Sequence, residues 1–309
     1  MRRFVYSHAA THFLHKGDRM NRRSLLRGAV TAAAAFVLRP VFSLGVDASG
    51  ASARLAALER QRGGRLGVAI LDTGNGRRIG HRADERFLMC STFKLLAVSA
   101  VLARVDRGVE RLDRRIVFGK EAVLAYAPVT SHRVGVPGMT VVGLCQAAIT
   151  VSDNTAANLL LASLGGPAAV TSYVRSLGDA VTRLDRIEPE LNVGSPGDVR
   201  DTTTPNAMLT DLHTLLLGNV LSNSSREQLA EWLRATSTGV QQLRAGMPDN
   251  WLVGDKTGSG AHRETNDVAI MWPPQRKPLL VTAYYADSTA DQAERHAVLA
   301  EVGRIAASI

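Results

Sequence analysis

The chain has 309 residues, 45% of them hydrophobic and 5% aromatic, so it can bury one large core or two interlocked ones. Its formal net charge is +9, but residues 1–43 hold eight of the 37 basic residues and one of the 28 acidic ones, which leaves +2 for the remainder. A body this close to neutral has no electrostatic surface for nucleic acid, and two cysteines are too few for a disulfide framework or a zinc site.

The N-terminal region has the pattern of an export signal. Residues 20–27 are basic and contain the pair Arg22-Arg23, and residues 28–38 are an apolar stretch. This stretch is too short to span a bilayer as a helix and has about the length of the apolar part of a signal peptide. The arginine pair indicates the twin-arginine route, and a general secretory signal with a chance pair is the alternative.

These patterns divide the chain into three parts. Residues 1–19 add nothing that a signal needs, so we predict that they are an upstream extension and that the true start is Met20. Residues 20–43 are then the export signal, and residues 44–309 are the mature domain. We predict a periplasmic location for this domain, without attachment to the membrane after processing.

The domain at 44–309 begins with a predicted helix and a β-hairpin. Residues 51–62 place leucines and alanines on one helical face. An apolar strand at 66–71 is followed by a strong turn signal at 72–76, and residues 77–81 return as the paired strand.

The tetrapeptide Ser91-Thr92-Phe93-Lys94 opens an apolar run that is too long for one strand and predicts a buried helix. Residues three apart share a helix face, so the Ser91 hydroxyl and the Lys94 amine would lie side by side. A serine becomes a nucleophile when a neighbouring base takes its proton, and burial lowers the pKa of a lysine enough for this task. The alternative from these residues alone is a helix-capping serine with an ordinary lysine.

The rest of the chain divides into a helical middle and a strand-rich end. From residue 93 to about 233 the periodicity is mainly helical, with loops rich in glycine and proline at 126–138 and 187–206. Short apolar runs bounded by turn residues predict three strands, at 250–256, 267–272 and 279–285. A last helix is predicted at 291–307.

The predicted fold class is therefore α/β, an α+β sandwich. An antiparallel sheet of about five strands is flanked by the terminal helices, and a mostly helical second lobe is inserted between the strands. We assign residues 51–85 and 235–309 to the sheet lobe and residues 86–234 to the helical lobe.

Three further motifs follow in chain order: Ser152-Asp153-Asn154, the run from Glu188-Pro189 to Asn192, and Lys256-Thr257-Gly258. At average residue usage each tripeptide is expected below about 0.1 times by chance, so their joint occurrence is not accidental. With Ser91-x-x-Lys94 they resemble the signature of class A serine β-lactamases, in the superfamily of penicillin-binding proteins. The resemblance runs from about residue 51 to the C-terminus and implies hydrolysis of β-lactam antibiotics, and hence resistance to them.

The resemblance implies four catalytic roles. Ser91 matches the nucleophile that opens the lactam ring to form an acyl-enzyme, and Lys94 matches its base or proton relay. Ser152 matches the hydroxyl that passes a proton to the departing ring nitrogen. Glu188 matches the base that activates the hydrolytic water.

The substrate-binding residues follow in the same way. Asn154 matches the amide that holds the substrate side-chain carbonyl, and Asn192 helps Glu188 to orient the water. Lys256, Thr257 and Ser259 would face the substrate carboxylate, and the backbone N–H groups of Ser91 and Ser259 would form the oxyanion hole. Tyr126 matches an aromatic at the cleft mouth, with a core tyrosine as the alternative.

Residues 186–201 resemble the family's Ω-shaped loop. Arg186 and Asp201 match the salt-bridge pair that closes its neck, and Glu188-Pro189 matches a peptide bond that is cis in the family. A proline-rich surface loop is the alternative. Penicillin-binding transpeptidases and carboxypeptidases lack the glutamate–water device, so Glu188 favours hydrolysis over trapping. We assign Asp153 a structural role, bracing its loop.

The chain also departs from the family pattern. The two positions from which relatives supply a carboxylate-binding arginine hold Thr265 and Gln242, and Arg263 or His296 are the candidates to replace it. Arg244 is expected to pair with Asp255 instead. The cysteines, Cys90 and Cys145, lack the partners found in some relatives, so we predict two buried, inert thiols.

We therefore expect a monomeric, exported serine β-lactamase that acts on small-molecule β-lactams. The sequence suggests no metal, no organic cofactor and no nucleic-acid partner, and the export machinery is expected to read the signal. The alternatives are a D-alanyl-D-alanine carboxypeptidase, and a non-hydrolytic sensor that binds β-lactams and stays acylated.

Overall fold

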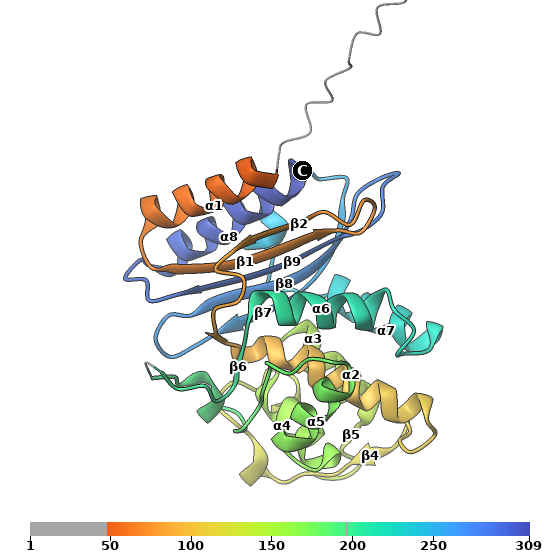
Figure 1. Cartoon of the computed structure of the whole chain (residues 1–309). Coiled ribbons are helices and arrows are strands. Elements are labelled where there is room, and N and C mark those ends of the chain that lie inside the picture. Colours follow the sequence, from red (N-terminus) through yellow and green to blue (C-terminus); the bar gives the residue numbers. More distant parts are fainter. Residues whose placement is uncertain (1–47, 196) are drawn as a thin grey trace, which may run out of the picture. The chain divides into compact units, whose positions relative to one another are not determined.

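The computed structural model describes residues 48–195 and 197–309 (Figure 1). The predicted upstream extension and export signal lie outside the described residues. Within the described part, none of the helices is both long enough and apolar enough to cross a membrane.

A five-stranded antiparallel sheet is formed by strands from both ends of the domain, in the order β2-β1-β9-β8-β7. This sheet confirms the predicted fold class. The register aligns Arg65 with Ala286 and Lys256 with Val268. The strands are β1 (Arg65–Asp72), β2 (Arg78–His81), β7 (Leu252–Ser259), β8 (Thr265–Trp272) and β9 (Leu279–Ala286).

Two helices, α1 (Ala48–Arg62) and α8 (Gln292–Ala307), cover one face of this sheet (Figure 1). Successive strand residues point to opposite faces, so alternate residues of one strand enter different cores. Val281 and Ala283 of β9 pack under these helices, whereas Leu280 and Tyr284 face the other side. Because both faces are covered, β9 is buried along its whole length.

The other face of the sheet packs against the helical middle of the chain (Figure 1). Helix α2 lies within this part and is buried from Phe93 to Ala103, because its sequence is apolar on all sides. The helices are α2 (Phe93–Asp106), α3 (Val141–Thr150), α4 (Asn154–Leu164), α5 (Pro167–Ser176), α6 (Pro205–Leu216) and α7 (Asn223–Arg234).

Local sequence signals fix several helix ends. The Asp153 carboxylate caps α4 by accepting from the Ala156 N–H, and Gly165 ends this helix with φ of 104°. Helix α8 starts with a capping box in which Asp291 and Glu294 exchange hydrogen bonds.

Two short strand pairs and five 3₁₀ turns complete the described part of the domain. The pair β3–β6 ties the segment before α2 to the chain that leads into α6. The pairs are β3 (Phe87–Leu88) with β6 (Thr202–Thr203) and β4 (Arg115–Ile116) with β5 (Met139–Thr140). The turns are Cys90–Thr92, Lys120–Ala122, Thr130–His132, Glu190–Asn192 and Leu243–Gly246.

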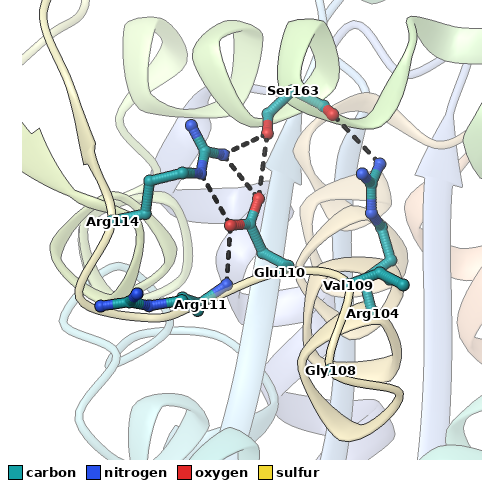
Figure 2. A pocket seen from close by; sticks show the side chains of 7 residues that line it. All are labelled: Arg104, Gly108, Val109, Glu110, Arg111, Arg114 and Ser163. Atoms are coloured by element: carbon teal, nitrogen blue, oxygen red, sulfur yellow. Dashed lines mark hydrogen bonds and ion pairs between the residues drawn. The ribbon is translucent and has the colours of Figure 1, made fainter.

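A cavity of about 740 Å³ lies where α2 and α4 end (Figure 2). Figure 2 shows Arg104 and Arg114 reaching Ser163 from two sides: Arg104 Nη1 donates to its carbonyl oxygen at 3.1 Å, and Arg114 Nη2 to its hydroxyl at 2.6 Å. Arg114 also pairs with Glu110. Cations at helix C-termini interact favourably with the helix dipole, so this cluster ties two helix ends together.

Candidate active site

A cleft of about 420 Å³ lies between strand β7, the turn before α2 and the start of α4. The structure brings most of the predicted site residues to this one cleft although they are far apart in sequence. Its lining residues are Ser91, Tyr126, Ser152, Asn154, Asn192, Thr238, Gln242, Thr257, Gly258, Ser259, Gln292 and His296.

Ser91 sits in a 3₁₀ turn immediately before α2, where the backbone is unusual. The preceding residue, Cys90, has φ of +47°, a conformation that non-glycine residues adopt mainly where the surroundings enforce it. Strand β7 passes so close that a Cβ on Gly258 would lie 2.8 Å from the Met89 carbonyl oxygen, so only glycine fits there. These constraints hold the Ser91 hydroxyl at the cleft wall.

Cys90 and Cys145 are both buried and unbridged, and the prediction of two buried thiols is confirmed. Burial raises the pKa of the Cys90 thiol well above its usual range. A thiol without access to its thiolate is a poor nucleophile, so Cys90 does not compete with its neighbour Ser91.

Lys94 is fully buried in the first turn of α2 and contacts the side chains around Ser91. Its Nζ lies 2.8 Å from Ser91 Oγ, 2.6 Å from Asn154 Oδ1 and 2.8 Å from Glu188 Oε1. Burial lowers the pKa of Lys94, and the Glu188 carboxylate opposes this shift. The amine is therefore in direct contact with the Ser91 hydroxyl, and its burial favours the neutral form.

Glu188 is almost completely buried, with 1% of its surface exposed, and its two carboxylate oxygens have different partners. Ser91 Oγ lies 3.3 Å from its Oε1, and the Asn192 amide donates to its Oε2. The Asn192 Oδ1 atom is buried and accepts no hydrogen bond from the described residues. A small polar molecule beside Glu188 could satisfy this acceptor.

Ser152 joins the two buried lysines. Its hydroxyl lies 3.2 Å from Lys94 Nζ and 3.1 Å from Lys256 Nζ, and its backbone has φ of +59°. Lys256 is also fully buried on β7, and burial together with the nearby Lys94 lowers the pKa of Lys256 to about 7. Lys256 Nζ also donates to the carbonyl oxygen of Thr257 at 2.9 Å.

Asp153 points away from the cleft. Its carboxylate accepts from the backbone N–H groups of Val129 and Thr130, from the Thr130 hydroxyl and from the Ala156 N–H. It thus fixes the loop that follows Tyr126, whose side chain is 50% exposed at the cleft mouth rather than in the core.

The loop that carries Glu188 is closed at its neck. Arg186 Nε lies 2.5 Å from Asp201 Oδ2, and Asp201 Oδ1 accepts from the backbone N–H groups of Asp185 and Arg186. Asp201 is fully buried, and the Glu188–Pro189 peptide bond is cis.

The two candidates for a substitute carboxylate-binding cation lie in different places. His296 lines the cleft, and its Nδ1 lies 3.3 Å from Gln241 Oε1. Arg263 Nη1 donates to the Thr289 carbonyl oxygen instead. Arg244 pairs with buried Asp255, as the sequence predicts.

The sequence motifs did not single out Asn158 or Thr238. Asn158 Oδ1 accepts from the Glu188 N–H at 2.9 Å, and its Nδ2 donates to the Glu188 carbonyl oxygen at 2.8 Å. Its position one helical turn after Asn154 was the one available signal. Thr238 Oγ1 lies 2.6 Å from Thr257 Oγ1. Thr238 lies in the segment before β7 and belongs to no recognisable sequence motif.

Among the described residues no group of three or more histidine, cysteine, aspartate or glutamate side chains is arranged to hold a metal ion. The chemistry available to the cleft is that of a serine, two buried amines and a carboxylate, an arrangement suited to nucleophilic acyl transfer.

Comparison with known proteins agrees with this geometry. The family described as "Beta-lactamase enzyme family" matches residues 50–309. Beta-lactamase L2 of Stenotrophomonas maltophilia is 51% identical over 257 residues, which cover 83% of this chain and 84% of the relative. Beta-lactamase AST-1 of Nocardia asteroides is 47% identical over 296 residues, covering 93% and 95%.

Solved structures give the same result. The ancestral (GNCA) class A beta-lactamase is 63% identical, with a TM-score of 0.81, and the match covers 82% of this chain and 98% of that one. The similarity thus extends over nearly the whole domain that contains the cleft. The chain belongs to the class A β-lactamases, serine hydrolases that open the β-lactam ring.

Proposed function

We propose that the chain hydrolyses β-lactam antibiotics through an acyl-enzyme on Ser91 that a water activated by Glu188 releases. One observation carries this proposal: Lys94 Nζ lies 2.8 Å from both Ser91 Oγ and Glu188 Oε1. Nucleophile, amine and carboxylate are therefore in one hydrogen-bonded chain, and the proton of Ser91 has an acceptor in direct contact.

In the acylation step, Ser91 Oγ attacks the lactam carbonyl while its proton passes to Lys94 or, through it, to Glu188. The lowered pKa of Lys94 supports this role, because only the neutral amine accepts a proton. The N–H groups of Ser91 and Ser259 stabilise the developing oxyanion. Ser152 then delivers a proton to the ring nitrogen and regains it from a neighbouring lysine.

In the deacylation step, a water held by Glu188 and Asn192 attacks the ester carbonyl. The unsatisfied Asn192 Oδ1 and the Glu188 carboxylate both accept hydrogen bonds, so they would orient the two protons of that water. Glu188 removes one proton as the bond forms, and Lys94, in contact with both groups, passes a proton to Ser91 Oγ, which leaves as the neutral alcohol.

The opposite wall of the cleft binds the substrate. Thr257 and Ser259 line this wall, and with the buried Lys256 of the same strand they face the substrate carboxylate. Asn154 holds the side-chain carbonyl, and Tyr126 packs on the substrate at the mouth. His296 adds a polar group at the carboxylate end where relatives use arginine.

The test is to replace Glu188 by alanine. Glu188→Ala is expected to acylate at Ser91 and then stall, so mass spectrometry after mixing with a penicillin should show a persistent adduct. The matched control is Glu190→Ala, because Glu190 lies in the same loop with its side chain exposed. Unchanged turnover by Glu188→Ala, without an adduct, would contradict the assignment.

Assays of the wild-type protein distinguish β-lactam hydrolysis from the two alternative functions. Catalytic hydrolysis of a chromogenic cephalosporin by residues 44–309 is expected. Stoichiometric acylation without turnover would instead indicate a sensor, and release of D-alanine from a D-alanyl-D-alanine peptide would indicate a carboxypeptidase.

We further propose export to the periplasm by the twin-arginine route, cleavage after residues 20–43, and a monomeric mature enzyme. The Arg22-Arg23 pair and the apolar stretch at 28–38 support this route. N-terminal sequencing of the exported protein tests the proposed start and cleavage, and a mature form that retains residues 1–19 would contradict them.

A further inference from the structure

Two buried carboxyl groups face one another away from the cleft. Asp211 lies on α6 and is 1% exposed, and Asp179 lies after α5 and is 8% exposed. Asp179 Oδ1 accepts from the backbone N–H groups of Val181 at 2.6 Å and Thr182 at 3.0 Å. The Oδ2 atoms of both aspartates are buried and receive no hydrogen bond from a described donor.

Both carboxyl groups are buried with an unpaired Oδ2 atom, and they lie close enough for the charge of Asp179 to act directly on Asp211. Two carboxylates have only acceptors, so a hydrogen bond between them requires a proton on one of them. That proton satisfies both orphaned oxygens at once, and it removes the repulsion between two charges buried side by side.

The surroundings decide which carboxyl group carries the proton. Burial by itself would raise the pKa of Asp179, but the hydrogen bonds from Thr182 and Val181 lower it, so Asp179 is the ionised partner. Burial, and then the charge of Asp179, raise the pKa of Asp211 to about 9, so Asp211 is the neutral donor at physiological pH.

Three other titratable side chains face the pair. Tyr173 and Arg175 come from α5, and Tyr284 comes from β9. Arg175 directs its Nη1 to the carbonyl oxygens of Asp179 and Thr182, so its guanidinium donates to these backbone groups, and its charge only partly opposes the raised pKa of Asp211.

The position of the pair gives it a consequence for catalysis. Asp179 begins the segment that enters the loop of Glu188, and Asp211 lies on the helix that leaves it. Between the pair and the neck, the same two segments are joined by Thr182 Oγ1 to Thr203 Oγ1 at 2.6 Å and by the Arg183 N–H to the Thr202 carbonyl oxygen at 3.0 Å.

We propose that Asp211 is a positioning residue for β-lactam hydrolysis: one proton shared with Asp179 clamps the stem of the loop that places Glu188. The catalytic consequence rests on the proposed role of Glu188, whereas the shared proton itself does not. When Asp211 ionises, the clamp opens and the loop loses its fixed stem.

The pH dependence has a defined sign. Between the ordinary aspartate range and about pH 9, the folded chain holds a proton at Asp211 that the unfolded chain releases. Stability therefore falls as pH rises through this window. Asp211→Asn keeps an N–H donor for Asp179 and removes the titration. The melting temperature of this variant minus that of the wild type should therefore increase as pH rises from about 5 to about 8.

The first experiment detects the proton directly. An infrared difference spectrum between the wild type and Asp211→Asn at neutral pH should show the C=O stretch of one neutral carboxylic acid in the wild type alone. A difference that contains only carboxylate bands would overturn the proposal, including the case of two carboxylates bridged by a bound cation.

The second experiment measures deacylation of a penicilloyl-enzyme by stopped flow against pH. Above about pH 9 the wild type should lose deacylation rate relative to Asp211→Asn by about tenfold per pH unit. Asp211→Ala, which leaves Asp179 Oδ2 unpaired, should deacylate slowly at every pH, and asparagine should rescue it. Identical profiles for wild type and Asp211→Asn would overturn the positioning role.

The two experiments keep the proposals apart. If Glu188 were not the deacylation base, Glu188→Ala would turn over normally while the infrared band of Asp211 remained. If the proton were absent, the band would be missing although Glu188→Ala still stalled as an acyl-enzyme.

Discussion

At the scale of single residues, the cleft is defined by buried charge. Lys94 and Lys256 are both fully buried, and Ser152 lies within hydrogen-bonding distance of each. Desolvation lowers the pKa of both lysines, so each can lose its proton at a pH where an exposed lysine stays charged. The same burial that shapes the cleft thus makes its chemistry depend on pH.

Lys256 gives the first pH prediction. Because the pKa of Lys256 is about 7, the free enzyme loses this cation as pH rises past neutrality, and attraction for the substrate carboxylate weakens. We expect kcat/KM for a penicillin to fall above about pH 7 and to fall less in Lys256→Arg, whose guanidinium stays charged. A substrate ester that lacks the carboxylate is the control, and an equal fall with the ester would rule out this cause.

Asn158 gives a second prediction. It holds Glu188 by two backbone hydrogen bonds without contacting the cleft. Asn158→Ala should slow deacylation by about tenfold or more, since each lost hydrogen bond is worth about 1 kcal/mol. Burst kinetics with a chromogenic cephalosporin measures this, and an acylation rate reduced as much as the deacylation rate would indicate general unfolding instead.

Much of the cleft could be located from short motifs in the sequence. Ser91, Ser152 and Lys256 each stand in such a motif, and the structure brings their side chains into one hydrogen-bonded cluster with Lys94. Asn158 has no such neighbourhood, because its role comes from the fold, which brings α4 against a loop thirty residues away. A supporting hydrogen bond of this kind leaves no local pattern.

At the scale of elements, the loop of Glu188 depends on its neck. Asp201 is fully buried and accepts hydrogen bonds from Arg186 and two backbone N–H groups. Asp198 in the same loop pairs with exposed Arg200 nearer the surface. Both aspartates pair with an arginine of the same loop, but only Asp201 is fully buried. Mutating each of them therefore compares a buried ion pair with a more exposed one.

We expect Asp201→Asn to lower the free energy of unfolding by about 3 kcal/mol and to slow deacylation, because it breaks a buried ion pair. Asp198→Asn should lower it far less, because its pair with Arg200 is screened by solvent. Urea unfolding followed by circular dichroism gives both values. Equal effects from the two variants would show that burial of the neck is unimportant.

The strand ends show where pattern reading failed. The sequence predicts a strand at 250–256, whereas β7 extends from Leu252 to Ser259 and includes the Lys256-Thr257-Gly258 motif. Glycine and polar residues are poor strand formers, so the apolar pattern stops where the functional residues begin. Pairing with β8 carries the strand onward, and that partner is invisible to a local window.

At the scale of the whole molecule, ion pairs join separate elements. Burial by itself would raise the pKa of Glu59, but hydrogen bonds from Arg82 and the Leu66 N–H hold it at about 2. Hydrogen bonds from Arg114 bring the pKa of Glu110 to about 2 as well. The first pair ties α1 to the edge of the sheet. The second lies in the loop after α2, and its hydrogen bonds to Ser163 tie that loop to the end of α4.

Both shifts predict loss of stability in acid. A depressed folded pKa contributes stability that is present above about pH 4.5 and lost as pH falls towards 2. Glu110→Gln should lower the free energy of unfolding by about 1 kcal/mol at neutral pH and flatten its acid dependence. Exposed Glu121→Gln is the control, and a parallel acid dependence in wild type and Glu110→Gln would contradict the assignment.

The pairing of β1 with β9 constrains how the chain can be made. Arg65 lies opposite Ala286, so the apolar strand β1 leaves the ribosome long before its partner has been synthesised. Contacts between such distant segments form slowly, and an unpaired apolar edge is prone to aggregate. A nascent chain that stops before Leu279 cannot close the sheet. The sheet therefore closes only at the end of synthesis, and until then the edge of β1 that meets β9 has no partner strand.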